Sequence, residues 1–383
     1  MLAPSRNLLG IPFIAIAGVL TGCSSDAPNT ARVDVQISGE DAATDGFLYP
    51  SGSEVTFVDG WELHFSHLLV TIDAITLAEN PDLAPGDQSR TGAVVARATG
   101  PWAVDLVVPG SVPGAGGEGL ATPLVSIPNM NLRGGEPFAA DERYAFGYRI
   151  VRAADDARRV NFADSATEAL YARMIERGEA VLYVGTATFK GTDCTASDDG
   201  YDFASLPKSV PFELGFATPA SYVNCQNQEN QGTAFDGEEY QRGIPLPSNR
   251  AALAQITLHV EHPFFSDTVH DSPVFFDQMA APLVGEKPST TLTIEHFADV
   301  DPTAFTDGSG AALPWRACPQ GAKPPAGKQR AFGVGHVLVD SSGDPGEVFR
   351  DYRDYVSYLQ STQGHLNGGE GICYVERDYP SPL

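Results

Sequence analysis

The chain has 383 residues, 42% of them hydrophobic, and its 49 acidic side chains against 24 basic ones give a formal net charge of −25. This negative charge disfavours nucleic acid and an anionic membrane surface as partners, because both would repel it. The 20 Phe, 13 Tyr and 3 Trp are typical of a folded core and exclude a disordered chain. The 39 glycines and 29 prolines favour many strands joined by turns over long helices.

An export signal opens the chain. Arg6 precedes an apolar run over residues 8–20, and the tetrapeptide LTGC, which ends at Cys23, closes it. The run is shorter than the about 20 residues that a bilayer core requires, so it is typical of a secretory signal and not of a membrane span. LTGC resembles a bacterial lipobox, whose cysteine becomes the acylated first residue of the mature protein. We therefore expect lipidation at Cys23.

The same segment predicts the organisation and location of the protein. We expect a signal peptide over 1–22, a lipidated tether over 23–31 and one large domain over 32–383, with a subdivision near 300–330 as the alternative. Several acyl chains on one residue give stable anchoring, so the lipid would be the only membrane contact. Ser24 after the cysteine favours the outer membrane in bacteria that sort lipoproteins by this residue. The membrane face and any protein or glycan partner stay open.

The four other cysteines predict two disulfides. Cys194, Cys225, Cys318 and Cys373 are an even set in an exported chain, which indicates an oxidising compartment. Proximity in sequence favours the pairs Cys194–Cys225 and Cys318–Cys373 among the three pairings that four cysteines allow. A thiolate metal site would need close spacing such as C-x₂-C, which this sequence lacks.

Alternating apolar residues predict strands along most of the chain. The strongest signal is Glu54–Leu77, where Trp61, Leu63 and Phe65 alternate and Leu68, Val70 and Ile72 then alternate in the opposite phase. Such a phase slip indicates a β-bulge or a hairpin corner. The other predicted strands are 32–38, 93–97, 102–108, 144–151, 180–189, 210–216, 254–260, 290–296 and 333–339.

Helices are few in the predicted fold. Ser165 and Glu168 form a capping box, and Gly178 stands where that helix would end. Ser272–Pro273 predicts the start of a short helix, and apolar residues over 348–359 share one helical face. Strands at short spacing with these insertions predict a mainly β protein, an antiparallel β-sandwich with a few helical insertions.

Histidines are the candidate metal ligands. His259, His262 and His270 lie close in sequence, with Asp271 adjacent, and His64 and His67 lie in the strongest predicted strand. Histidines three apart point to opposite faces of a regular strand, so each pair needs a bulge or a strand end to share an ion. Imidazole suits copper and zinc, and a carboxylate completes such sites. The alternative is that these histidines are structural and hydrogen-bond to loops.

Calcium is the weaker metal candidate, and enzyme motifs are missing. Two groups of aspartates could supply oxygen ligands, but neither has the spacing of an EF-hand loop; they comprise Asp198, Asp199 and Asp202, and Asp299, Asp301 and Asp307. The sequence contains no G-x-S-x-G, H-E-x-x-H or Walker motif. A catalytic triad dispersed through the chain is recognised only by geometry.

Three blocks resemble a known group of proteins. Together with the lipobox, FVDGWELHFSHLLVTIDAITLAENPD (57–82), EHPFFSDTVHDSPVFFDQMAA (261–281) and GHLNGGEGICYV (364–375) resemble an uncharacterised family of secreted bacterial lipoproteins. That resemblance spans most of the mature chain and implies no activity. The early strand with YAFGYRI (144–150) is also similar to periplasmic β-sandwich proteins linked to copper-peptide uptake, which bind copper through histidines and a modified tryptophan. Trp61 beside His64 and His67 is the chemistry that matches.

Two functions follow from the sequence. The first is a non-enzymatic cell-envelope protein that binds copper or zinc through the region 259–271. The second is an envelope interaction or carbohydrate-binding module in which the histidines are structural. A hydrolase is a more distant third hypothesis, and an enzyme is disfavoured because no catalytic motif is present.

Overall fold

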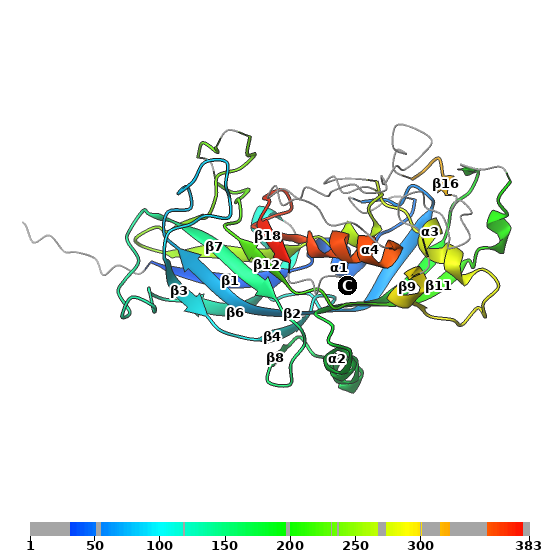
Figure 1. Ribbon diagram of the computed structural model, residues 1–383, viewed down its shortest axis with the longest axis horizontal. Helices are drawn as coiled ribbons and strands as arrows, with labels where there is room; N and C mark the ends of the chain where they lie inside the picture. The colour runs from blue at the N-terminus through cyan, green and yellow to red at the C-terminus, as the bar shows by residue number, and fades with distance from the viewer. Residues whose placement is uncertain are drawn as a thin grey trace, which may run out of the picture.

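The computed structural model describes residues 31–50, 55–117, 119–196, 200–230, 232–235, 237–266, 273–298, 300, 315–321 and 351–377. In these ranges the protein is mainly β, with two large sheets packed against each other and a few short helices (Figure 1). The predicted fold class, a β-sandwich, is confirmed.

The smaller sheet has five strands in the order β17–β14–β1–β6–β5. Its strands are β1 (Arg32–Ser38), β5 (Val112–Pro113), β6 (Leu120–Ile127), β14 (Ala251–Leu258) and β17 (Gly364–Leu366). β1 and β14 run parallel, whereas β17 is antiparallel to β14. The parallel pair departs from a purely antiparallel sandwich, and it places the ends of β1 and β14 at the same edge of the sheet.

The larger sheet has eleven strands and is built around the long strand β2 (Trp61–Ala78). Its main path runs β15–β11–β9–β2–β7–β12–β18, while β3, β4, β8 and β13 pair beside that path. Their bounds are β3 (Val94–Ala98), β4 (Trp102–Asp105), β7 (Arg143–Ile150), β8 (Arg158–Val160), β9 (Val181–Phe189), β11 (Ser209–Phe216), β12 (Ala220–Val223), β13 (Ile244–Pro245), β15 (Leu292–Thr293) and β18 (Tyr374–Arg377).

The phase slip in β2 is a β-bulge, one of the two alternatives that the sequence predicted. The register against β9 shifts between Phe65 and His67. Apolar residues before and after the shift therefore enter the same core between the sheets, although their phases differ in sequence. Leu69, which alternates with the inward residues, faces a second apolar cluster on the other side of the sheet.

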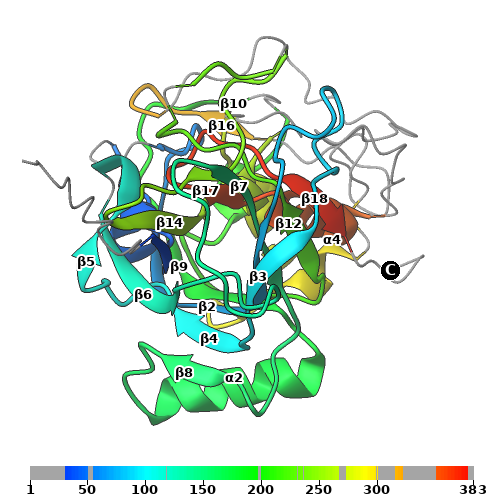
Figure 2. The same cartoon turned by 90° about the vertical axis from the view of Figure 1, so that its left-hand side faces the viewer.

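Helix α2 (Ser165–Arg177) covers that outer side, below β4 and β8 in Figure 2. Its N-cap is Asp164, whose carboxylate accepts hydrogen bonds from the N–H groups of Ala166 and Thr167, so the predicted cap at Ser165 is wrong. Gly178 ends the helix in the left-handed conformation, as predicted. The predicted C-terminal helix is α4 (Tyr352–Ser361).

Some predicted elements are shorter than expected. The predicted strand 290–296 reduces to β15, because a 3₁₀ turn, η5 (Ile294–Phe297), follows at once. The helix predicted from Ser272–Pro273 begins only with α3 (Asp277–Ala280), and the predicted strand 333–339 lies outside the described residues. The remaining elements are α1 (Glu40–Asp45), β10 (Thr195–Ala196), β16 (Arg316–Ala317) and the 3₁₀ turns η1 (Ala115–Gly117), η2 (Phe203–Ser205), η3 (His262–Phe264) and η4 (Ala281–Leu283).

All four described cysteines form disulfides, as predicted, but the predicted pairing Cys194–Cys225 and Cys318–Cys373 is wrong. The bonds are Cys194–Cys318 and Cys225–Cys373, which join residues 124 and 148 positions apart. The reason is strand pairing: β10 pairs with β16 beside the first bond, and β12 pairs with β18 beside the second. Each disulfide therefore connects neighbouring strands that are distant in sequence.

The described part of the chain contains no candidate for a membrane-spanning helix. None of its helices is both long enough and apolar enough to cross a bilayer.

Candidate metal centre

Three histidines meet where the smaller sheet ends. His259 follows β14, His262 begins η3, and His365 lies in β17. In the antiparallel β14–β17 ladder Thr257 stands opposite His365, and the N–H of His259 donates to the carbonyl of Gln363 at 2.9 Å. His259 and His365 are thus diagonal neighbours on one face of this strand pair, within reach of each other's rings.

The three rings are close enough to share a metal ion. One ligand atom from each of His259, His262 and His365 lies within 4.8 Å of the others. The ring centroids of His259 and His365 are 4.5 Å apart, and the His262 ring is 5.7 Å from each of the other two. Two nitrogens bound at about 2.1 Å in a tetrahedral zinc site lie about 3.4 Å apart, so a modest inward movement would complete the site.

Hydrogen bonds prepare two of the rings for ligation. His365 Nδ1 lies 3.2 Å from the carbonyl of Gly371, which can only accept. His262 Nδ1 lies 2.7 Å from Thr362 Oγ1, and that hydroxyl donates its one hydrogen to the carbonyl of Leu359 at 2.8 Å. In the neutral rings both Nδ1 atoms therefore carry the proton, and both Nε2 atoms carry the lone pair that a metal needs.

His259 lies between two carboxylates. Its Nε2 is 3.0 Å from Glu40 Oε1, and its Nδ1 is 3.3 Å from Glu261 Oε1. Burial by itself lowers the pKa of His259, but Glu261 and Glu40 outweigh it and hold that pKa well above its usual value. The two carboxylates therefore favour a positive charge at this ring, and a bound metal ion would supply that charge in place of a proton.

The fold places Glu40 at this point. Ser38 and Thr257 are partners in the parallel β1–β14 ladder, so two residues further on Glu40 comes level with His259. Glu40 has a φ of 59°, a left-handed conformation that is rare outside glycine. Backbone strain of this kind is concentrated at functional sites.

A glycine-rich loop covers the His259 ring. A Cβ built on Gly369 would lie 2.1 Å from both Cε1 and Nε2 of His259. No side chain fits in that space, so the position requires glycine for close approach of the backbone. His262 and His365 are each only 2% exposed, which leaves the centre almost closed to solvent.

The structure brings together only part of the predicted ligand set. His259 and His262 meet as expected, whereas His270 and Asp271 lie outside the described residues. The cluster contains neither His64, whose side chain is 54% exposed beside Glu62, nor His67, whose Nδ1 lies 2.8 Å from Asp105 Oδ2. The bulge in β2 exists, but the two imidazoles form carboxylate contacts of their own.

The predicted calcium ligands are mostly outside the described residues. Asp198, Asp199, Asp299, Asp301 and Asp307 belong to this group. Asp202 is described, and its carboxylate accepts the N–H of Ala204 at the start of η2. This is an ordinary capping role.

His365 is not among the metal ligands predicted from the sequence. It lies in the quoted block 364–375, and the glycines that follow it are a signal of close backbone approach. However, the strand that contains it has only three residues, and its pairing with β14 joins positions more than a hundred residues apart. Proximity in sequence favoured His270, whereas strand pairing supplies His365.

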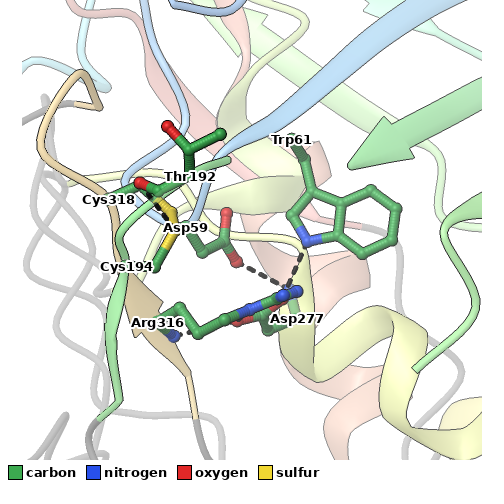
Figure 3. Close-up of a disulfide and its surroundings, with 7 residues drawn as sticks. All are labelled: Asp59, Trp61, Thr192, Cys194, Asp277, Arg316 and Cys318. Carbon is green, nitrogen blue, oxygen red and sulfur yellow. Dashed lines mark hydrogen bonds and ion pairs between the residues drawn. A yellow bond between two sulfur atoms is a disulfide. The ribbon is translucent and has the colours of Figure 1, made fainter. Parts of the chain in front are cut away.

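A second buried cluster accounts for Trp61. Its indole N–H donates to Asp277 Oδ1 at 2.8 Å, and the Arg316 guanidinium binds both oxygens of the same carboxylate at 2.6 and 3.0 Å (Figure 3). Arg316 also stacks on Phe189, 3.6 Å from the ring centroid, near the Cys194–Cys318 disulfide. Trp61 is therefore held in this ion-pair cluster, which we call the Asp277 lock.

Comparisons with known proteins give no relative. No family, no curated protein and no solved structure matches this chain.

Proposed function

We propose that the protein is a non-enzymatic cell-envelope lipoprotein that binds one copper or zinc ion through His259, His262 and His365. The observation that carries this proposal is the meeting of two buried imidazoles with the partly buried His259, whose ligand atoms lie within 4.8 Å of one another. Imidazole ligands suit Zn²⁺ and Cu²⁺, whereas Cu⁺ prefers thiolate and thioether. All four described cysteines are in disulfides and offer no thiolate.

The charges around the centre favour a cation. Glu40 and Glu261 contact His259 from two sides, and a dication in place of its proton would keep both carboxylates neutralised. Calcium suits the centre poorly, because it takes six to eight oxygen ligands and this cluster offers imidazole nitrogens.

The N-terminal sequence supports the location in this proposal. The lipobox at Cys23 would attach the protein through acyl chains, and Ser24 favours the outer membrane. The two disulfides are compatible with a compartment outside the cytoplasm. A Cys23→Ser variant should lack the anchor and leave the membrane fraction on detergent phase partitioning.

Calorimetric titration of the soluble Cys23→Ser protein with Zn²⁺ and with Cu²⁺ tests metal binding. We expect one site per chain and its loss in the His365→Ala and His262→Ala variants, because two imidazoles hold an ion much more weakly than three. His64→Ala is the matched control: its exposed ring lies outside the cluster, so this variant should bind like the parent. Absence of binding, or equal binding by the cluster variants and the parent, would refute the proposal.

A second candidate, an interaction or carbohydrate-binding module, is favoured by a cleft of about 830 Å³ away from the histidines. Polar groups dominate its walls, and carboxylates and amides are suited to sugar hydroxyls. The lining residues are Glu79, Asn80, Pro81, Asp82, Leu83, Ala139, Glu142, Arg143 and Tyr144. Binding of a labelled glycan panel that Glu142→Ala abolishes and His365→Ala preserves would select this second function.

A further inference from the structure

We propose that the metal centre keeps one coordination position for a small exchangeable ligand, water or a small anion, to which the side-chain amide of Gln363 donates a hydrogen bond. This inference rests on the proposed function and deepens it, because it says what the bound ion can take up.

The strand pairing places Gln363 beside the cluster. Thr257 and His365 are partners in the antiparallel β14–β17 ladder, and the N–H of His259 donates to the carbonyl of Gln363 two residues further on. Residues directly opposite in such a ladder have side chains on the same face. The amide of Gln363 is therefore a neighbour of the His259 ring.

Hydrogen bonding fixes this amide and leaves its donor end without a partner. The hydroxyl of Tyr183, a buried residue of the facing sheet, donates to Gln363 Oε1. Gln363 is 0% exposed, and among the described residues no acceptor lies within hydrogen-bonding reach of its Nε2. Because buried donors are almost always satisfied, we expect an acceptor beyond the described residues here, and a small ligand on the metal ion would supply it.

The ligand count agrees with this expectation. Among the described residues three imidazoles can bind the ion, which leaves one further position on a four-coordinate ion, the arrangement of metal sites that exchange ligands. The approach is narrow, because His262 and His365 are almost fully buried and the backbone of Gly369 lies against His259. Only a ligand of a few atoms can therefore enter.

Azide titration of the Cu²⁺-loaded Cys23→Ser protein tests the inference. Azide is a small anion, and its binding to Cu²⁺ produces a charge-transfer absorption that reports occupancy of the open position. We expect saturable binding, and an affinity at least about tenfold lower in Gln363→Leu, because a hydrogen bond to a charged ligand is lost. Gln360→Leu, the same change at a buried glutamine of α4, should bind azide like the parent.

A second variant covers the case in which Gln363→Leu does not fold. Gln363→Glu has nearly the same shape but places a carboxylate where the amide donated, so it should abolish azide binding while the copper stays bound. Copper that binds stoichiometrically in the parent but shows no azide absorption refutes this inference alone. Equal azide affinity in the parent and both Gln363 variants also refutes it, whereas failure of copper itself to bind refutes the proposed function as well.

Discussion

The Asp277 lock and the histidine cluster are both buried and both join residues far apart in sequence, yet their polar atoms are used differently. In the lock, each carboxylate oxygen of Asp277 accepts two hydrogen bonds, and Arg316 supplies the opposite charge. In the cluster, three imidazoles lie together beside two carboxylates, and the Gln363 amide next to them has a donor that no described residue satisfies. The difference separates a cluster whose polar contacts satisfy one another from a cluster at which we propose that a metal ion binds.

We expect the largest effect from a substitution that disrupts the Asp277 lock. Asp277→Ala leaves the Arg316 charge and the Trp61 N–H buried without their acceptor, which should lower the free energy of unfolding by about 3–5 kcal/mol. Urea denaturation measures this. Glu79→Ala removes the exposed ion pair with Arg133 and should cost less than about 1 kcal/mol. If both variants lost the same free energy of unfolding, the buried Asp277 lock would contribute no more to stability than an exposed ion pair.

Removal of each disulfide in turn should give the next largest effect, and only one of the two bonds lies next to the histidine cluster. They join residues 124 and 148 positions apart, so the chain-entropy model gives each nearly the same stabilisation, about 5 kcal/mol at most, and removal of either bond should cost about 2–5 kcal/mol. The Cys225→Ser/Cys373→Ser variant should also weaken metal binding, because Cys373 follows the loop that covers His259. The Cys194→Ser/Cys318→Ser variant should bind metal normally. Denaturation and calorimetry together measure both effects.

Metal binding should raise the stability of the protein by an amount that depends on the histidine cluster and not on the Asp277 lock. At a free Zn²⁺ concentration one hundred times the dissociation constant, binding should add about 2.7 kcal/mol to the free energy of unfolding. His365→Ala should lose this increment, while Asp277→Ala, measured below its own midpoint, should retain it. Denaturation with and without Zn²⁺ gives the answer. An increment that survives in His365→Ala would place the ion elsewhere.

The smallest effect concerns a third buried carboxyl, Glu179, which is 7% exposed. Burial raises its pKa from 4.5 to about 7, against the lowering effect of Arg177 and with a further rise from Glu213. The folded state thus binds the proton more tightly than the unfolded chain, so this contribution to stability is lost as pH rises from about 4.5 to 7.

Glu179→Gln removes that ionisation. Relative to the parent, the variant should gain about 1–2 kcal/mol between pH 5 and pH 8, an amount reduced by screening from water and the neighbouring arginines. Denaturation midpoints across this pH range measure the gain. A difference between variant and parent that does not change with pH would contradict the burial of an ionisable group at this position.

Local signals in the sequence were sufficient for much of the fold. The alternation in 32–38 gave β1 at its full length, and the phase slip gave the bulge before His67. Gly178 marked the end of α2, because a left-handed residue there needs no partner from elsewhere in the chain. The predicted ends of some elements were wrong where tertiary contacts decide them, as in the predicted strand 290–296, of which only β15 is a strand.

By itself the sequence determined the β class and the participation of Cys194, Cys225, Cys318 and Cys373 in disulfides, because periodicity and residue chemistry are local properties. It offered His259 and His262 as one candidate pair because they are close in sequence. Only the tertiary structure decided which cysteines pair and that His365 completes the cluster. These contacts depend on the order of strands in the sheets. Strand order is set by the summed packing of two large sheets, so no local window of sequence contains it.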